Sequence, residues 1–220
     1  ALHQSTMSSA EDFDGRFISP QLVARLPFNK NGIDYGYVRD RGVEGKAWNA
    51  TENLYSVMIM NKYITPEAAI SPIDNNPFAG VKGDATEPQA GGVAVPYNFA
   101  AYDPATGTAR TSPEHFWDTK FYTDLTDEEP DHGSWANNTL MGARTNKWNA
   151  NEGSDQGCWS TRGVKCGYRD GTDEHDGSSV LEMLGPENMF QSHVAYADGT
   201  VRMIDNMLAF KHHFAQEGYT

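Results

Sequence analysis

Near its C-terminal end the chain contains the stretch Gln191-Ser192-His193-Val194-Ala195-Tyr196-Ala197-Asp198-Gly199-Thr200-Val201-Arg202-Met203-Ile204. On either side of its centre, larger apolar side chains alternate with small or polar ones, which is the period of two that a pleated strand requires. Between the two halves, Asp198-Gly199 is a strong signal for a tight hairpin, because a type I′ turn needs positive φ at both central residues. By itself the stretch predicts an antiparallel hairpin and says nothing about function.

At the other end of the sequence, residues 1–13 have the spacing of an amphipathic helix. Leu2, Thr6, Ala10 and Phe13 fall on one stripe, and Gly15 suits the left-handed position that follows a helix. No capping Ser, Asp or Pro precedes the first residue, so we expect residues 1–14 to be the C-terminal end of a longer helix. We also expect the stripe, with Phe13, to pack on a sheet.

Three segments together resemble type IV pilin-like proteins, in particular the planctomycete-type pseudopilin-like families with a prepilin cleavage and methylation signal. The run Asp12-Phe13-Asp14-Gly15-Arg16-Phe17, with Ala1-Leu2-His3 before it, is similar to their "ALH…DxxGxFP" segment. Residues 54–66 followed by Ser71-Pro72-Ile73-Asp74 resemble their "Y(I/V)TxPxxFxCPSD" segment. Residues 196–204 resemble their C-terminal "FADGSVRFI" hairpin, and the three matches occur in the family's order.

The match departs from the family pattern at two positions. Asn188 stands ten residues before Asp198, where these families carry His, and Ser71 stands where they carry Cys. The chain therefore resembles a divergent member, and no role tied to those two family residues carries over to it.

The resemblance implies an α+β fold, in which an N-terminal helix packs on a small antiparallel β-sheet with long loop insertions. Residues 1–220 would form a single domain, with a loop-rich insert at 103–190. The implied function is that of an exported, non-catalytic structural subunit of a pilin-like filament or a type II secretion pseudopilus. Its partners would be copies of itself or other pilin-like subunits. It would lie at the cell surface, outside the cell or in the periplasm, attached to the membrane only through a helix upstream of this sequence.

Composition agrees with a folded, acidic body. The net charge of −13 would repel a phosphate backbone, so we do not expect nucleic acid as a partner. Aromatic residues make up 11% of the chain and five of them are Trp, which favours a packed core over disorder. The printed sequence contains neither a run of eighteen apolar residues nor a signal peptide.

The sequence contains two cysteines, Cys158 and Cys166. In an exported protein we expect them to form one disulfide, whose short loop would stabilise the fold by about 2.5 kcal/mol. The alternative is a pair of free thiols in a cytosolic protein. A zinc site is disfavoured, because only His175 lies near them in sequence.

Carboxylates gather in two segments, Asp124–Asp131 and Asp170–Gly177. The second alternates acidic residues with Gly, an arrangement that supplies hard oxygen ligands for calcium, although it lacks the spacing of an EF-hand. Major pseudopilins of type II secretion hold calcium in a C-terminal loop, so the resemblance favours the same cation here. The expected ligands are Asp170, Asp173, Glu174 and Asp176. The alternative is a solvated acidic loop.

An enzyme and a binding module were weighed against the structural subunit. The four residues His115, His132, His175 and His193 could join Asp side chains in acid–base chemistry, but the sequence has no nucleophile elbow, P-loop, HExxH or dinucleotide motif. The aromatic cluster of Phe116, Trp117, Phe121 and Tyr122 is expected to form a small core rather than a platform for sugars. An extracellular carbohydrate- or surface-binding module is the alternative function.

Two further elements are expected between the matched segments. Residues 33–38 alternate as a short strand does. Thr51 has the character of a helix cap, with Leu54, Val57 and Met58 on one face of a helix that runs to about Asn61.

Overall fold

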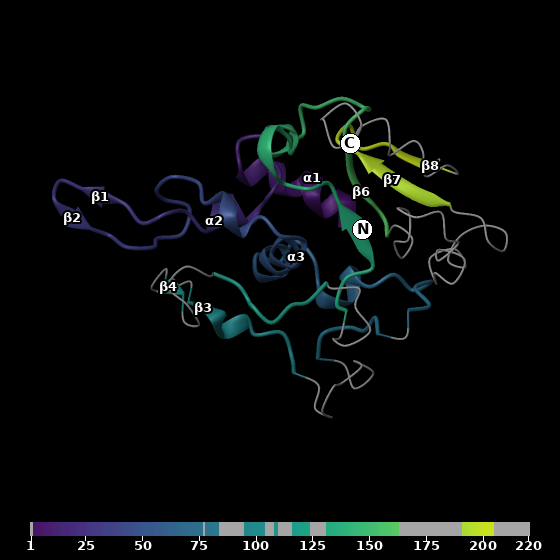
Figure 1. The fold of residues 1–220 in the computed structure, drawn as a ribbon, viewed down its shortest axis with the longest axis horizontal. Coiled ribbons are helices and arrows are strands. Elements are labelled where there is room, and N and C mark those ends of the chain that lie inside the picture. Colours follow the sequence, from purple (N-terminus) through teal and green to yellow (C-terminus); the bar gives the residue numbers. More distant parts are fainter. Residues whose placement is uncertain are drawn as a thin grey trace, which may run out of the picture.

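The computed structural model describes residues 2–76, 78–83, 95–103, 108–109, 116–123, 131–162 and 191–204 (Figure 1). Its helices are α1 (Leu2–Asp12), α2 (Pro20–Val23) and α3 (Thr51–Met60), with 3₁₀ turns η1 (Lys46–Trp48), η2 (Pro66–Ala69), η3 (Phe99–Ala101) and η4 (Gly142–Lys147). Two short hairpins pair β1 (Asn29–Lys30) with β2 (Ile33–Asp34), and β3 (Tyr102–Asp103) with β4 (Thr108–Ala109). A four-stranded sheet contains β5 (Trp135–Asn137), β6 (Gly157–Thr161), β7 (Ser192–Tyr196) and β8 (Val201–Ile204). The described residues therefore have the expected mixed α+β class.

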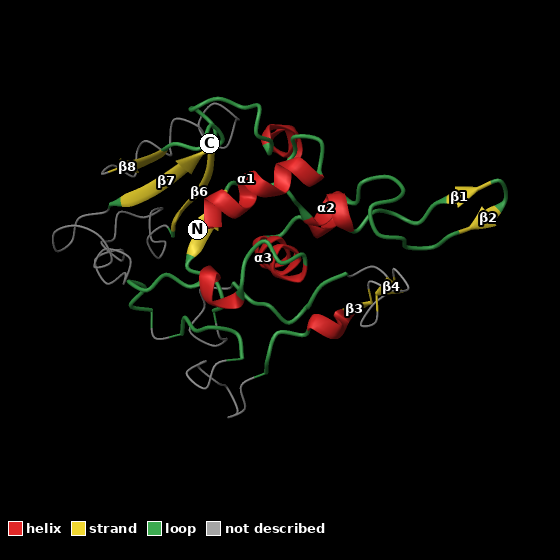
Figure 2. Ribbon diagram, turned by 180° about the vertical axis from the view of Figure 1, so that it is seen from behind, coloured by secondary structure: helices red, strands yellow, loops and turns green. Residues whose placement is uncertain are grey.

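Helix α3 forms the centre of the core. Every residue from Leu54 to Ile59 is buried, so the helix is enclosed on all sides rather than on the one face that its sequence predicted. In Figures 1 and 2 it is seen nearly end-on, between α1 and α2 on one side and η3 with β3 on the other. The predicted cap is wrong by one position: the N-cap is Ala50, and Thr51 is the first helical residue.

The tyrosine in α3 ties the helix to the sheet. The Tyr55 hydroxyl donates to the backbone carbonyl of Trp135 at 2.8 Å and accepts from its N–H at 3.2 Å. Burial raises the pKa of Tyr55 well above its usual value, so the hydroxyl keeps the proton that it donates. The core helix α3 and the edge strand β5 are therefore joined by two hydrogen bonds through one hydroxyl group.

The sheet has the strand order β5-β6-β7-β8, and all of its pairs are antiparallel. Residues 103–190, expected as a loop-rich insert, provide both β5 and β6. Within the sheet, Trp159 of β6 lies opposite Ala195 of β7, with a register shift between Gly157 and Trp159. Strands β5 and β8 are the two edges of the described sheet, and Val201 and Met203 on β8 are exposed.

Helix α1 packs against this sheet through its predicted stripe. Leu2, Thr6 and Ala10 are buried, and the indole N–H of Trp159 donates to the Thr6 hydroxyl at 2.9 Å. Phe13 follows the end of the helix and is only partly buried against the core, whereas Phe17 is fully buried. Phe13 thus packs against the core, as the stripe predicted, but the more deeply buried aromatic anchor after α1 is Phe17.

The turn between β7 and β8 is not the predicted type I′ turn. The N–H of Gly199 donates to the carbonyl of Tyr196, and the N–H of Tyr196 donates to the carbonyl of Thr200. Within the turn only Gly199 has positive φ, at 86°, while Asp198 does not. This is the pattern of a three-residue loop that ends in a left-handed glycine.

The aromatic cluster expected as core is confirmed for three of its four members. Phe116, Trp117 and Phe121 are each at most 1% exposed, while Tyr122 is 38% exposed. The indole of Trp117 donates to Asn53 of α3 at 2.9 Å, and Phe121 stacks on Tyr55 with 5.8 Å between ring centroids. Within the described ranges, none of the helices combines the length and the hydropathy that a membrane crossing requires.

Candidate interaction surface

A narrow projection, residues 25–44, extends away from the body and is called the arm here (Figure 1). At its base, Arg25 and Glu44 form an isolated antiparallel β-bridge through their backbones. Next to this bridge, the N–H of Leu26 donates to the carbonyl of Val43 at 2.7 Å. At its tip β1 and β2 pair through Lys30 and Ile33. Between the tip and the base, the N–H of Tyr35 donates to the carbonyl of Phe28 at 3.1 Å. The strand expected over residues 33–38 is limited to Ile33–Asp34.

The tip of the arm is formed by Asn31-Gly32. Both residues have positive φ, 56° and 79°, as the central residues of a type I′ turn require. Asn tolerates this left-handed conformation better than most residues, and Gly adopts it without a steric cost. The type I′ turn predicted for the C-terminal hairpin is therefore found here instead.

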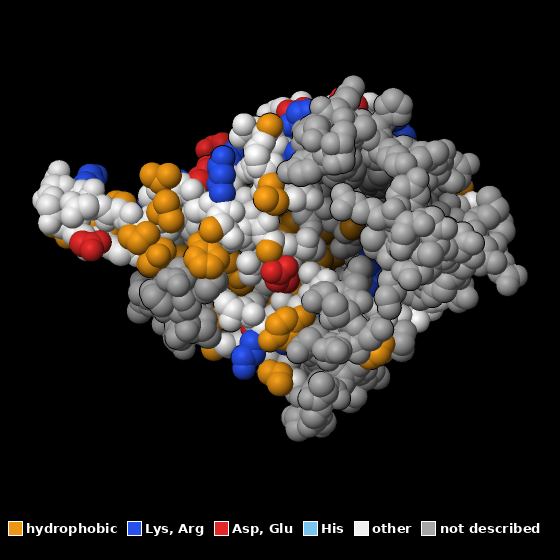
Figure 3. All heavy atoms as spheres, in the orientation of Figure 1, with side chains coloured by type: hydrophobic (Ala, Val, Ile, Leu, Met, Phe, Trp, Pro, Cys, Tyr) orange, Lys and Arg blue, Asp and Glu red, His pale blue; other side chains and the backbone are white. Residues whose placement is uncertain are grey.

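An open hollow lies along the arm, lined by Arg25, Phe28, Lys30, Tyr35, Asp40, Arg41 and Gly42. The rings of Phe28 and Tyr35 stack face to face, with 5.0 Å between centroids and 4° between planes. Figure 3 shows hydrophobic side chains gathered where the arm joins the body. The hollow thus places a stacked aromatic pair, in which Phe28 is half-buried and Tyr35 is exposed, beside several cations.

Polar contacts with α2 and its neighbours fix the base of the arm. Arg16 holds Glu44 through both carboxylate oxygens, one bond at 3.1 Å, and Gln21 donates to the same carboxylate at 3.0 Å. The bond from Arg16 lowers the pKa of Glu44, which keeps this carboxylate charged. Gly42 has φ +99°, and a side chain there would meet the carbonyl oxygen of Leu26 at 2.3 Å. Backbone geometry therefore requires glycine at this position.

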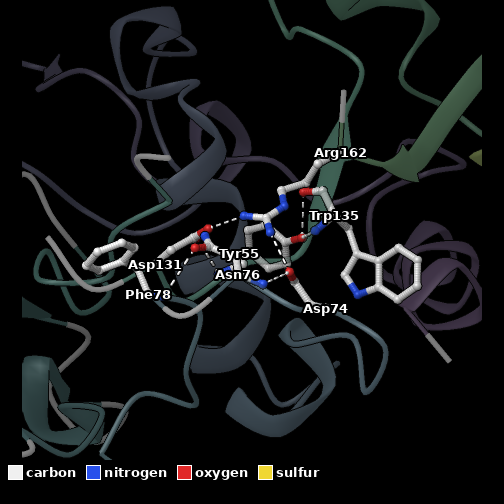
Figure 4. Close-up of polar contacts among 8 residues, drawn as sticks. Tyr55, Asp74, Asn76, Phe78, Asp131, Trp135 and Arg162 are labelled. Carbon is white, nitrogen blue, oxygen red and sulfur yellow. Dashed lines mark hydrogen bonds and ion pairs between the residues drawn. The ribbon is translucent and has the colours of Figure 1, made fainter. Parts of the chain in front are cut away.

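A buried ion triad lies inside the body (Figure 4). The guanidinium of Arg162 contacts Asp74 and Asp131 at 2.5 Å each, and the three side chains are at most 5% exposed. Asp131 also accepts from the N–H of Gly133 at 3.0 Å, and Asp74 from the N–H of Asn76 at 3.0 Å. The triad is enclosed, so it holds the segments around Asp74 and Asp131 to the end of β6.

Asp131 is the last residue of the first acidic segment that the sequence analysis named, and it is buried. The other acidic residues of that segment, 124–130, lie outside the described residues. The expected calcium ligands, Asp170, Asp173, Glu174 and Asp176, also lie outside them. Among the described residues, no group of three or more His, Cys, Asp or Glu side chains is placed to hold a metal ion.

Calcium binding by the second acidic segment stays a prediction from the sequence. Titration calorimetry with calcium on chelator-stripped protein should release or absorb heat, and calcium should raise the melting temperature by binding the folded state alone. A variant with Asp170, Asp173 and Asp176 changed to Asn should lose both signals. If the unaltered protein shows neither, the segment is merely acidic.

The disulfide also stays a prediction, because Cys166 lies outside the described residues. Cys158 is buried on β6, with its sulfur 3.8 Å from the carbonyl oxygen of Gln156. Burial, followed by the charge of Asp198, raises the pKa of the Cys158 thiol to about 12, so a reduced Cys158 would be unreactive. Mass spectrometry of denatured, unreduced protein should show one disulfide. Two alkylated thiols in that sample would contradict the prediction.

Asp198 stabilises the C-terminal turn in a pH-dependent way. Its carboxylate accepts from the Thr200 N–H at 3.0 Å and from the Thr200 hydroxyl at 2.7 Å, and these bonds lower the pKa of Asp198. A lowered pKa stabilises the fold above the unfolded-state pKa, and this effect is lost as pH falls through the folded-state value. Asp198→Ala should therefore cause a small drop in melting temperature at neutral pH.

Measurements at low pH and a control variant test the same prediction about Asp198. The difference between Asp198→Ala and the unaltered protein should vanish in acid. Asp155 is an exposed carboxylate with no hydrogen bond or ion pair among the described residues, so Asp155→Ala should change little at any pH. A difference for Asp198→Ala that persists unchanged in acid would show that the charge is not what stabilises the turn.

The sequence indicated neither the projection of the arm nor the association of Asp74, Asp131 and Arg162. The Asn31-Gly32 dipeptide was an available signal for the arm, since it is a common hairpin turn. No local signal indicated the triad, because Arg162 and Asp74 are 88 residues apart. In the comparisons with known proteins, no family model, no curated protein and no solved structure matches this chain.

Proposed function

We propose that this chain is an exported structural subunit of a pilin-like filament or of a type II secretion pseudopilus, and that it carries no catalytic activity. Other copies of the chain, or other pilin-like subunits, are its partners. A hydrophobic helix upstream of this sequence anchors each subunit in the membrane before assembly. Filament subunits need a helix that bundles with its neighbours and a body that presents loops outward.

The observation that carries the proposal is the position of α1. The helix lies against the face of the antiparallel sheet that contains Trp159, held by the Thr6 bond and by burial of Leu2 and Ala10. Its other side, with Gln4, Ser8 and Glu11, is exposed. One face thus belongs to the subunit's own body, while the other is free for contacts with neighbouring subunits.

The backbone after α1 supports the same reading. The Ser9 hydroxyl accepts from the N–H of Ile18 at 2.9 Å, and the indole of Trp148 donates to the carbonyl of Ile18 at 2.9 Å. The segment directly after α1 is therefore hydrogen-bonded both to the helix and to the loop before β6. A helix attached so firmly transmits a pull along its axis to the whole body, as a filament subunit requires.

The test is expression of the full-length gene in its host, followed by shearing of surface filaments and detection of the protein in them. We expect the chain in the filament fraction, and a hydrophobic helix in the gene upstream of Ala1. Replacing an apolar residue at the centre of that upstream helix by Asp should remove the protein from the filaments. A gene without such a helix would contradict the proposal.

A carbohydrate- or surface-binding module is the second candidate, and the stacked pair on the arm favours it. Tyr35 is 44% exposed, and aromatic faces beside polar groups are suited to stacking on sugar rings. Binding of the protein to neutral polysaccharides, measured by affinity electrophoresis, should then be lost in Tyr35→Ala. Retention of binding in that variant, or no binding at all, would count against this candidate.

A further inference from the structure

The arm has short strands and exposes several large apolar side chains to solvent. Its strands contain two residues each, and a two-stranded hairpin is marginally stable in water. Leu26, Ile33, Tyr35 and Val43 are 46%, 57%, 44% and 72% exposed. They make up four of the eleven large exposed hydrophobic residues in the described part of the chain. An apolar projection of this kind marks a surface that another molecule covers.

The charge of the arm is opposite in sign to that of the rest of the chain. Within residues 25–44 there are four basic residues (Arg25, Lys30, Arg39 and Arg41) and three acidic ones (Asp34, Asp40 and Glu44), a net charge of +1. The whole chain carries −13, so the remainder carries −14. The remainder of any second copy therefore carries a net charge opposite in sign to that of the arm.

The basic side chains of the arm differ in whether they have a hydrogen-bond or ion-pair partner. Arg25 donates to carbonyls of its own segment, and Arg39 contacts Asp40 at 3.2 Å. Partial burial raises the pKa of Asp40, and Arg39 and Arg25 oppose this rise. Lys30 and Arg41 are exposed, and within the described residues neither has a side-chain partner. Both line the hollow that contains the stacked aromatic pair.

We propose that the arm of one copy docks on the acidic body of a second copy, with Lys30 and Arg41 facing its carboxylates and the exposed aromatic and aliphatic side chains covered by its surface. The inference rests on the proposed function and names the contact that would join subunits. Such a contact uses different patches on the two copies, so it repeats from copy to copy and does not have to close into a dimer. A filament needs a contact of that kind.

The first test is sedimentation velocity of this chain over a range of concentrations at low salt. The unaltered protein should self-associate, and Lys30→Glu with Arg41→Glu should weaken the association by about tenfold or more. Lys120→Glu with Lys147→Glu changes the net charge equally at exposed lysines outside the arm, and this control should stay within about twofold of the unaltered protein. Circular dichroism should show that both variants are folded.

The second test locates the contact. A photo-crosslinking residue at position 43, used with mixed isotope-labelled and unlabelled protein, should join the arm of one copy to an acidic segment of another. Crosslinks confined within single chains, equal weakening by the two charge reversals, or a protein that stays monomeric at millimolar concentration would each overturn the proposal. Binding of heparin through Lys30 and Arg41 without self-association would also overturn it, and would make the arm a polysaccharide-binding surface.

The outcomes separate the two proposals. Filaments that form normally from the chain with Lys30→Glu and Arg41→Glu would refute the docking role and leave the filament function intact. Self-association through the arm, with no filaments from the full-length gene, would refute the filament function and leave the contact intact.

Discussion

Replacing Arg162 with methionine is expected to lower the free energy of unfolding by about 3–5 kcal/mol. The change removes the guanidinium that contacts both Asp74 and Asp131, whose side chains have no exposed surface. Two buried carboxylates would then lose the guanidinium that lies between them, which costs much more than the loss of an exposed pair. Urea denaturation followed by tryptophan fluorescence measures the effect.

A matched control separates burial from the mere loss of an arginine. Arg16→Met breaks the ion pair with Glu44, in which the side chains are 36% and 29% exposed, and should cost about 1 kcal/mol or less. Adding Asp74→Asn and Asp131→Asn to Arg162→Met should restore much of the lost stability, because the two carboxylates that faced the guanidinium are then neutral. If Arg162→Met costs no more than Arg16→Met, the triad does not stabilise the fold as described.

Phe17→Ala is expected to cost about 3–5 kcal/mol, the range for a buried aromatic side chain. Phe17 is 0% exposed and meets Trp148 edge to face, with 5.4 Å between the ring centroids. Its truncation would leave a cavity between the segment after α1 and the loop before β6. The fall in unfolding free energy should appear in urea titrations without a change in their slope.

Phe13→Ala is the matched control for that prediction. Phe13 lies four residues earlier and is only partly buried against the core, so its removal should cost about 1 kcal/mol. Equal losses for the two variants would contradict the assignment of Phe17 as the anchor.

Local patterns predicted much of the secondary structure and part of the core. The stripe of Leu2, Thr6 and Ala10 predicted α1 and its buried face, because helical spacing alone determines which residues share a side. The alternation around Asp198 predicted the β7–β8 hairpin for a similar reason. Phe116, Trp117 and Phe121 were correctly assigned to the core, since large apolar surfaces of this kind are buried wherever the fold allows.

Other features depend on neighbours that the local sequence does not identify. A stripe drawn at helical spacing selects Phe13, but α1 ends at Asp12, and the following turn carries Phe17 inward instead. Asp198-Gly199 and Asn31-Gly32 are both hairpin signals, and only pairing of the flanking strands decided which became the type I′ turn. The ion triad and the exposure of the arm arise from tertiary packing, so neither could be foreseen from spacing.

The bonds between α1, α3 and the sheet also have a kinetic consequence. Tyr55 is bonded to a partner 80 residues away, Trp148 to one 130 residues away, and Trp159 to one 153 residues away. Contacts of such long range make folding slow, because wide loops must close before the contacts form. The ribosome makes the first helix early, yet the strand against which it packs emerges much later. We therefore expect the chain to stay unfolded throughout its synthesis, the state in which a polypeptide can be threaded through a narrow translocation pore.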